Sequence, residues 1–242
     1  MKKQKVNVYI DGFNFYYALQ NKIADKQGGW TKEMQWCNYR LLFSNFLKEG
    51  EELNKVYFFS AYRVGDKSAV NRHKAFVEAL TKNWVRVVMG KYQKKTNRYK
   101  RWKHKIQEII YNGDLKEEEK CRKLLELLAY KTYEEKETDV KIAIQILQDA
   151  FTNSYDHAYI VSWDSDITPS IMTIRNLIKQ KILPKKEFSS ILVPGTKWQK
   201  IRNLCDNNNE ISTVMMKASI MPHQVEISEN KKVCIPDVWL KQ

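Results

Sequence analysis

Four aspartates stand where carboxylates at one edge of a sheet could bind a metal ion. Asp11 ends a short apolar segment, and Asp164 and Asp166 follow a second one. Asp139 opens a periodic, helix-like segment. Carboxylates gathered in one cleft repel each other, so such a cluster persists only when protons or cations neutralise it. Oxygen ligands favour Mg²⁺ or Mn²⁺, and such an ion can activate water for attack on a phosphodiester. The four residues therefore predict a metal-dependent hydrolytic site.

Each of these aspartates also has a structural explanation when it is taken alone. Asp11 precedes a glycine, and Asp-Gly is a common turn. Asp164 or Asp166 could cap the helix that follows, and Asp139 could offset the dipole of its own helix. Capping needs only one carboxylate of the pair, however. Asp139 shares the apolar side of its helix, where a solvated carboxylate is less expected.

Strand-like and helix-like segments alternate along the chain. Strands are expected at residues 5–10, 54–62, 84–92, 157–162 and 189–193, with a last short one at 211–214. Helices are expected at residues 15–24, 36–48, 68–81, 116–130, 138–151, 168–180 and 198–205. Alternation with nearly continuous apolar strands predicts an α/β fold whose mainly parallel sheet is covered on both faces. Ligands bind such sheets at the carboxyl ends of the strands, where Asp11 and the Asp164/Asp166 pair would stand.

Two segments depart from this alternation. Residues 93–135 form a long charged connection, which we interpret as an insertion. Residues 219–242 lose the alternation and are expected to form a C-terminal appendage. The predicted organisation is therefore one α/β domain at residues 1–218, carrying the insertion, followed by the appendage.

Composition excludes several classes of protein. The 242 residues are 43% apolar and carry a net charge of +14, which is typical of a globular, basic protein. No apolar run approaches the ~18 residues that span a bilayer, and the N-terminus does not resemble a secretory signal. The four cysteines form no C-x-x-C pair, so reduced thiols in a cytoplasmic protein are expected. The motifs G-x-G-x-x-G, G-x-x-x-x-G-K, G-x-S-x-G and H-E-x-x-H are all missing.

The start of the insertion is strongly basic. Residues 91–105 (KYQKKTNRYKRWKHK) contain eight Lys or Arg and no Asp or Glu. Cations bind phosphates and aromatic rings stack on unpaired bases, so the mixture favours single-stranded RNA over a duplex. A solvated charged loop is the alternative. The candidate nucleic-acid-binding residues are Lys91, Lys94, Lys95, Arg98, Tyr99, Lys100, Arg101, Trp102, Lys103 and Lys105.

Three segments carry a resemblance to a known family. They are residues 8–15 (VYIDGFNF), 135–150 (EKETDVKIAIQILQDA) and 159–171 (YIVSWDSDITPSI). In this order they resemble the NYN domain family, including its LabA-like members, which belongs to the PIN-like nucleases. The resemblance extends over most of residues 5–214. It implies a Rossmann-like, three-layer α/β/α fold, here with a basic helical insertion, and Mg²⁺- or Mn²⁺-dependent cleavage of RNA.

The resemblance also implies roles for individual residues. Asp11, Asp139, Asp164 and Asp166 match the acidic metal-site positions of the family. Asn14 matches the asparagine just after the first aspartate, and Ser162 and Ser165 match the serines around the acidic pair. On this pattern metal-activated water would attack the phosphorus. Asn14 and Ser165 would orient ligands or the phosphate.

The chain departs from the family pattern at two positions. It has Trp163 where the family usually has glycine, and Ile167 where the family has phenylalanine. A tryptophan beside the metal site could narrow the cleft, stack on a base, or mark a site of weakened activity. Non-catalytic RNA binding or a scaffold role is therefore the alternative function.

Two further alternatives remain. Residues 164–168 (DSDIT) also read D-x-D-x-T, the nucleophile motif of haloacid-dehalogenase-type phosphatases, although no downstream G-D-x-x-x-D follows. The leucine-rich helix expected at residues 116–130 would dock on its own chain, with a homodimer contact as the alternative.

Overall fold

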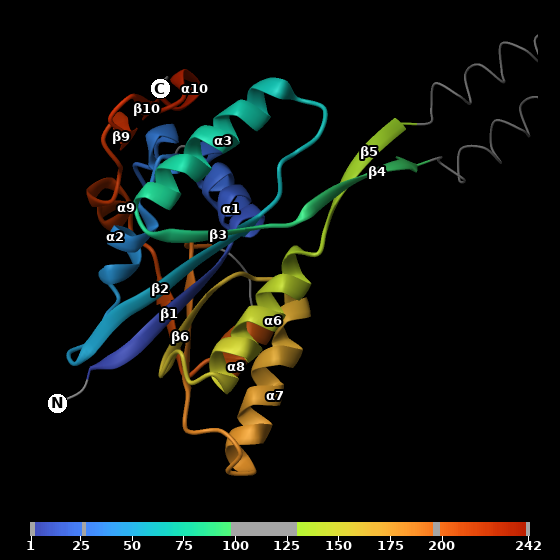
Figure 1. Cartoon of the computed structure of the whole chain (residues 1–242), viewed down its shortest axis with the longest axis vertical. Coiled ribbons are helices and arrows are strands. Elements are labelled where there is room, and N and C mark those ends of the chain that lie inside the picture. Colours follow the sequence, from blue (N-terminus) through green and yellow to red (C-terminus); the bar gives the residue numbers. More distant parts are fainter. Residues whose placement is uncertain (1–2, 26–27, 98–129, 196–198, 241–242) are drawn as a thin grey trace, which may run out of the picture. The chain divides into compact units, whose positions relative to one another are not determined.

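The computed structural model describes residues 3–25, 28–97, 130–195 and 199–240. The chain divides into two compact units, one of residues 1–91 and 137–242 and the other of residues 92–136. In the first unit, a six-stranded sheet has the order β3-β2-β1-β6-β7-β8. Strands β3, β2, β1 and β6 are labelled in Figure 1. All five pairs of neighbouring strands are parallel. The predicted α/β fold with a mainly parallel sheet is confirmed.

The bounds of the strands follow the apolar segments of the sequence. The six strands of the sheet are β1 (Gln4–Asp11), β2 (Glu51–Ser60), β3 (Val85–Met89), β6 (His157–Val161), β7 (Glu187–Leu192) and β8 (Asn207–Glu210). The strand expected at residues 84–92 ends earlier than predicted, at Met89. After Gly90 the chain leaves the sheet as β4 (Lys91–Asn97).

Helices cover both faces of the sheet. One face carries α1 (Gly12–Ala24), the 3-10 helix η1 (Lys32–Gln35), α2 (Tyr39–Ser44) and α3 (Lys67–Lys82). The other carries α6 (Thr138–Phe151), α7 (Thr168–Lys179) and α8 (Gln199–Leu204). Because side chains alternate along a strand, Val8 and Ile10 of β1 enter the first core and Tyr9 enters the second. No helix of the described residues is long and apolar enough to cross a membrane.

The second core contains a buried polar centre. Asp149 of α6 accepts hydrogen bonds from the Tyr9 hydroxyl at 2.8 Å and from Asn7 Nδ2 at 3.0 Å. Burial and the Asp149 charge raise the pKa of Tyr57 to about 12. These bonds satisfy polar groups that would otherwise be costly to bury, and they tie α6 to β1.

The C-terminal segment enters the first core. It forms α9 (Thr213–Ala218), β9 (Gln224–Ser228), β10 (Lys231–Cys234) and α10 (Asp237–Leu240). Val225, Val233 and Trp239 pack in the same hydrophobic cluster as α1 and α3. Residues 219–240, expected to be an appendage, thus contribute side chains to the body of the first unit.

The last strand was predicted at the wrong place. Residues 211–214 do not form a strand, because Ser212 caps α9 by accepting a hydrogen bond from the Met215 backbone. The edge strand is instead β8, whose sequence is the polar NNNE. Asp206 fixes it beside β7 by accepting a hydrogen bond from the Phe188 backbone at 2.9 Å. A polar edge strand gives no apolar signal, so the sequence pattern could not find it.

In the second unit, β4 and β5 (Tyr130–Lys136) pair as a two-stranded sheet. The helix expected at residues 116–130 lies outside the described residues, except for Tyr130, which begins β5.

Candidate active site at the carboxyl edge of the sheet

Asp11 is the last residue of β1, and its side chain is 2% exposed. It caps α1, because Oδ1 accepts a hydrogen bond from the Asn14 backbone at 3.0 Å. Its other oxygen, Oδ2, accepts from the side-chain amide of Asn14 and from Ser162 Oγ, the latter at 3.0 Å. Asp11 therefore does not form the expected Asp-Gly turn, because Gly12 already begins α1; it acts as the N-cap and holds a carboxylate at the sheet edge.

Ser162 connects the ends of the two central strands. It follows β6 directly, and β6 pairs with β1 up to Ile10 and Val161. Its hydroxyl donates to Asp11 Oδ2 and accepts a hydrogen bond from the Asp164 backbone at 3.0 Å. Asp11 and the chain that carries the acidic pair are therefore held together by one buried side chain.

The Asp11 carboxyl has a perturbed pKa. Burial, with a smaller contribution from the negative charge of Asp164, raises the pKa from 3.8 to about 6. Hydrogen bonds from Asn14 and Ser162 act in the opposite direction because they stabilise the ionised form. A carboxylate kept charged by donors, yet destabilised by burial and a like charge, favours a cation nearby.

The acidic pair divides into one capping residue and one exposed residue. Asp164 Oδ1 accepts a hydrogen bond from the Asp166 backbone at 2.8 Å and caps the 3-10 helix η2 (Ser165–Ile167). Asp164 and Ser165 are half-buried, whereas Asp166 is exposed. Since Asp164 already caps the helix, Asp166 has no capping role there.

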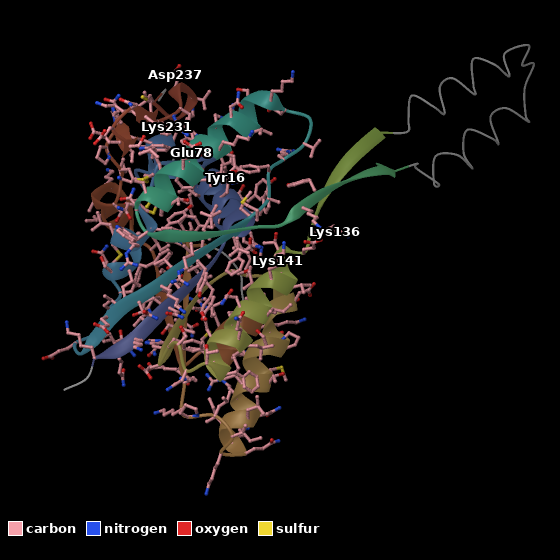
Figure 2. The ribbon with its side chains drawn as sticks, viewed as in Figure 1. Tyr16, Glu78, Lys136, Lys141, Lys231 and Asp237 are labelled. Atoms are coloured by element: carbon pink, nitrogen blue, oxygen red, sulfur yellow. The ribbon has the colours of Figure 1, made fainter. Side chains whose placement is uncertain are left out.

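Asp139 lies in the first turn of α6 and is half-buried. The fully buried stripe of this helix runs through Thr138, Ile142 and Ile146, so Asp139 stands at its border rather than on it. Lys141, labelled in Figure 2, donates a hydrogen bond to the Met89 carbonyl at 2.8 Å. This bond places the start of α6 beside the carboxyl end of β3. Helix α6 also packs against β1 and η2, so all four aspartates belong to the same edge of the sheet.

The candidate ligand atoms at this edge are of the element that a hard cation prefers. Within the part of the chain that the structure describes, no three Asp, Glu, His or Cys side chains are grouped closely enough to hold a metal ion. The donors at the edge are nevertheless oxygens, which Mg²⁺ and Mn²⁺ prefer. Asn14 Oδ1, next to Asp11, is buried and has no hydrogen-bond partner among the described residues. An oxygen in that position lacks the partner that a cation would supply.

The family model described as the NYN domain matches residues 5–193. The chain belongs to the NYN domain family. The three motifs that carried the resemblance all lie within the matched residues. The fold of this NYN domain is accordingly nuclease-like.

Two individual proteins are similar to this NYN domain. The 6-hydroxy-3-succinoylpyridine 3-monooxygenase HspA of Pseudomonas putida is 27% identical over 187 residues. The match covers 71% of this chain and 55% of that protein, so the chain spans about half the length of the relative. The crystal structure of a protein of unknown function from Vibrio parahaemolyticus is similar over 88% of this chain and 95% of that one, with a TM-score of 0.48 and 15% identity.

The predicted RNA-binding residues are only partly described. Lys91 forms an ion pair with Glu137, Nζ to Oε1, at 3.4 Å. Lys94 and Lys95 lie in β4, but their side chains are outside the described part of the structure. Arg98, Tyr99, Lys100, Arg101, Trp102, Lys103 and Lys105 all lie outside the described residues. A role for the basic segment in binding RNA remains a prediction.

A pocket of about 120 Å³ lies at the same edge of the sheet and was not predicted from the sequence. Gly12 and Phe13, which follow Asp11, contribute to its wall. Tyr16 on α1, labelled in Figure 2, also lines it and is 41% exposed. The signal was the aromatic run at residues 13–17, which resembles ordinary core packing unless the exposure of its members is known.

A Ser-His-Glu chain of hydrogen-bonding contacts lies at the opposite end of the strands. His157 Nδ1 is 2.6 Å from Glu51 Oε1, and His157 Nε2 is 2.7 Å from Ser189 Oγ. The order matches that of a hydrolase triad. None of the three residues is more than 8% exposed, and Ser189 is fully buried. No substrate can reach this serine in the described fold, so the contacts join the amino ends of β2, β6 and β7.

Proposed function

We propose that this NYN domain is a Mg²⁺- or Mn²⁺-dependent ribonuclease. The observation that carries the proposal is the link from Asp11 through Ser162 to Asp164 at the carboxyl ends of β1 and β6. It keeps a buried carboxylate, whose pKa is already raised, next to a second acidic residue. Membership of a family with a nuclease-like fold supports the same conclusion.

Each residue at the edge has a role in the proposal. Asp11 and Asp164 would hold the cation together with Asn14 Oδ1, and Asp139 and Asp166 would complete the acidic surface around it. When bound, the cation would supply activation of water and stabilisation of the leaving oxygen. Ser162 positions Asp11, and Ser165 would orient the phosphate.

The proposed substrate is RNA, in single-stranded form. The net charge of +14 favours a polyanion, and the aromatic residues of the basic segment favour unpaired bases. Binding should weaken steeply as salt rises, because neutralised phosphates release counterions.

The decisive experiment compares cleavage of end-labelled single-stranded RNA by the wild type, Asp166→Asn and Asp25→Asn. Asp25 is an exposed aspartate at the end of α1, so Asp25→Asn is the matched control. Reactions contain Mn²⁺, Mg²⁺ or EDTA. We expect metal-dependent cleavage by the wild type and the control. The Asp166→Asn protein should lose at least a hundredfold in rate while keeping its melting temperature.

Two results would contradict the proposal. Undiminished cleavage by Asp166→Asn would mean that the nuclease activity lies elsewhere or comes from a contaminant. A folded wild type that binds RNA in EDTA but never cleaves it would favour a non-catalytic RNA-binding protein. Trp163→Gly would then test whether the tryptophan blocks the site.

The pocket favours a second candidate. The P. putida relative is named as a monooxygenase of a hydroxypyridine, and the pocket beside Asp11 is lined largely by aromatic side chains. Hydroxylation of such a ring would require O₂ and a two-electron reductant. Incubation with a 6-hydroxypyridine, reduced nicotinamide cofactor and O₂, followed by mass spectrometry, tests it. A gain of one oxygen atom would favour this candidate over the nuclease.

A further inference from the structure

The pocket between α1 and α3 has the size and walls of a site for one aromatic ring. Its volume is about 120 Å³, near the ~150 Å³ of cavities that accept benzene. Tyr39 packs against Phe76 at 5.6 Å and against Phe58 at 5.5 Å, and all three line the pocket. Because these rings hold each other in place, the walls are preformed. Flat, apolar walls of this kind suit the faces of a planar ring.

One residue of the wall carries a polar atom that lacks a partner. Gln35, the last residue of η1, lines the pocket and is 5% exposed. Its Oε1 is buried and accepts no hydrogen bond from any described residue. An unpaired buried acceptor is unfavourable, so a ligand that offers an N–H in the plane of its ring would be selected over a plain hydrocarbon. This amide is the observation that distinguishes a ligand site from a packing gap.

The pocket also has a cationic side. Arg63 and Arg72 both line it. Arg63 is exposed and forms no hydrogen bond or ion pair within the described chain, and Arg72 donates one hydrogen bond, to Ser68 Oγ. The pKa of Asp66 is lowered chiefly by a hydrogen bond from the Ala69 backbone and to a smaller extent by Arg72 and Arg63, so two guanidinium groups here accompany one capping carboxylate. Arginine pairs with phosphate or carboxylate in a bidentate manner.

We propose that this pocket binds a six-membered nitrogen heteroaromatic ring that carries an anionic group, with Gln35 accepting from a ring N–H and Arg63 and Arg72 binding the anion. Two sources of this chemistry are a pyrimidine nucleotide and a small pyridine carboxylate. Binding of a pyrimidine nucleotide rests on the proposed ribonuclease function, and it would make the pocket a subsite for an RNA base beside Asp11. Gly12 and Phe13 connect the two regions, since they follow Asp11 and line the pocket.

Isothermal titration calorimetry of the full chain in EDTA tests the proposal without any contribution from a bound cation. The probes are uridine 5′-monophosphate, 6-hydroxynicotinate, uridine and phenyl phosphate. Phenyl phosphate has a ring and an anion but no ring N–H, and uridine has the N–H but no anion. The variants are Gln35→Leu, the double variant Arg63→Gln/Arg72→Gln, and Arg202→Gln as a control on α8.

The wild type should bind uridine 5′-monophosphate or 6-hydroxynicotinate saturably, and the tighter of the two identifies the source. Gln35→Leu should weaken that ligand at least tenfold and leave phenyl phosphate within twofold. The double arginine variant should weaken the same ligand at least tenfold and leave uridine within twofold. The control should bind like the wild type.

Other outcomes overturn the inference. Absence of saturable binding of both anionic heterocycles to folded wild type would remove the site. An equal loss of phenyl phosphate in Gln35→Leu would remove the role of the amide. The proposed function is judged separately, because Asp166→Asn should abolish RNA cleavage yet bind these probes normally. Absence of RNA cleavage by a wild type that binds the ring probes would contradict the ribonuclease function alone. Absence of ring binding by a wild type that cleaves RNA would contradict the pocket alone.

Discussion

At the scale of single residues, the candidate site is held together at a cost to stability. Asp11 is almost completely buried, and its pKa is raised to about 6 chiefly by that burial. The folded state thus disfavours the charge that a metal site requires. Natural sites commonly retain such groups because function needs them.

Replacing Asp11 by asparagine should therefore stabilise the protein at pH 8. The folded pKa lies above the unfolded value of 3.8, so the folded state binds more protons between pH 3.8 and 6 and stability falls as pH rises through that range. The full penalty is present above pH 6. An asparagine at this position can still cap α1, so we expect a gain of up to about 3 kcal/mol at pH 8.

Thermal unfolding in EDTA at pH 8 and pH 4 checks this expectation. The stabilisation should be nearly lost at pH 4, where the wild-type carboxyl is protonated in the folded state. A variant that is less stable than the wild type at pH 8 would show that the ionised carboxylate is not under strain.

His73 should make the protein sensitive to acid. Burial lowers the pKa of His73 from 6.5 to about 4, and its Nε2 lies 3.2 Å from Ser60 Oγ. Between pH 6.5 and 4 the unfolded chain binds more protons, so stability contributed by the neutral imidazole is lost as pH falls. In urea titrations, the free energy of unfolding of the wild type should therefore fall relative to that of His73→Gln as the pH is lowered from 6.5 to 4. A difference that is constant with pH would contradict the shifted pKa.

At the scale of elements, the junction between β1 and α1 allows no side chain at Gly12. A Cβ there would lie 2.6 Å from the Phe58 ring and 2.7 Å from the Phe59 carbonyl oxygen. Such distances do not occur in relaxed structures, so α1 can approach β2 only with glycine at this position. The same approach forms part of the pocket wall.

Gly12→Ala should consequently destabilise the fold and disturb both the acidic site at Asp11 and the pocket wall. Overpacking of this kind costs typically about 1–3 kcal/mol, and urea denaturation should report a loss in that range. Gly50→Ala is a useful comparison, because Gly50 has open space around its Cβ position but a φ of +82°. A Gly12→Ala protein as stable as the wild type would mean that the close packing at this junction is relaxed in solution.

Some elements could be predicted from the sequence because the spacing of their apolar residues indicates both their type and their bounds. Helix α6 has the predicted bounds, since its apolar period and flanking segments agree. Helix α2 is shorter than expected, with Tyr39–Ser44 helical and η1 before it. The polar strand β8 was missed because its pairing depends on Asp206 and on β7, which no local pattern reveals.

At the scale of the whole chain, the parallel arrangement of the strands follows from the alternation of strand and helix segments in the sequence. The exact assembly of the candidate site does not. The carboxyl ends of β1 and β6 were expected to bear the acidic residues, and the structure links Asp11 to Asp164 through Ser162. Asp139 was expected to join them, and its helix does pack against β1 and η2. The pocket could not be predicted, because Gln35 and Trp239 come from distant segments whose meeting depends on the tertiary fold.

The ion pair between Lys91 and Glu137 has a consequence for the modularity of the chain. The two residues border the second unit and approach each other to 3.4 Å. The chain therefore leaves the first unit after Lys91 and re-enters it at Glu137, close to the point where it left. A segment that leaves and returns in this way can be exchanged, lengthened or deleted through a short turn without changing the strand order of the sheet. Different inserts at this junction are therefore compatible with the same six-stranded sheet.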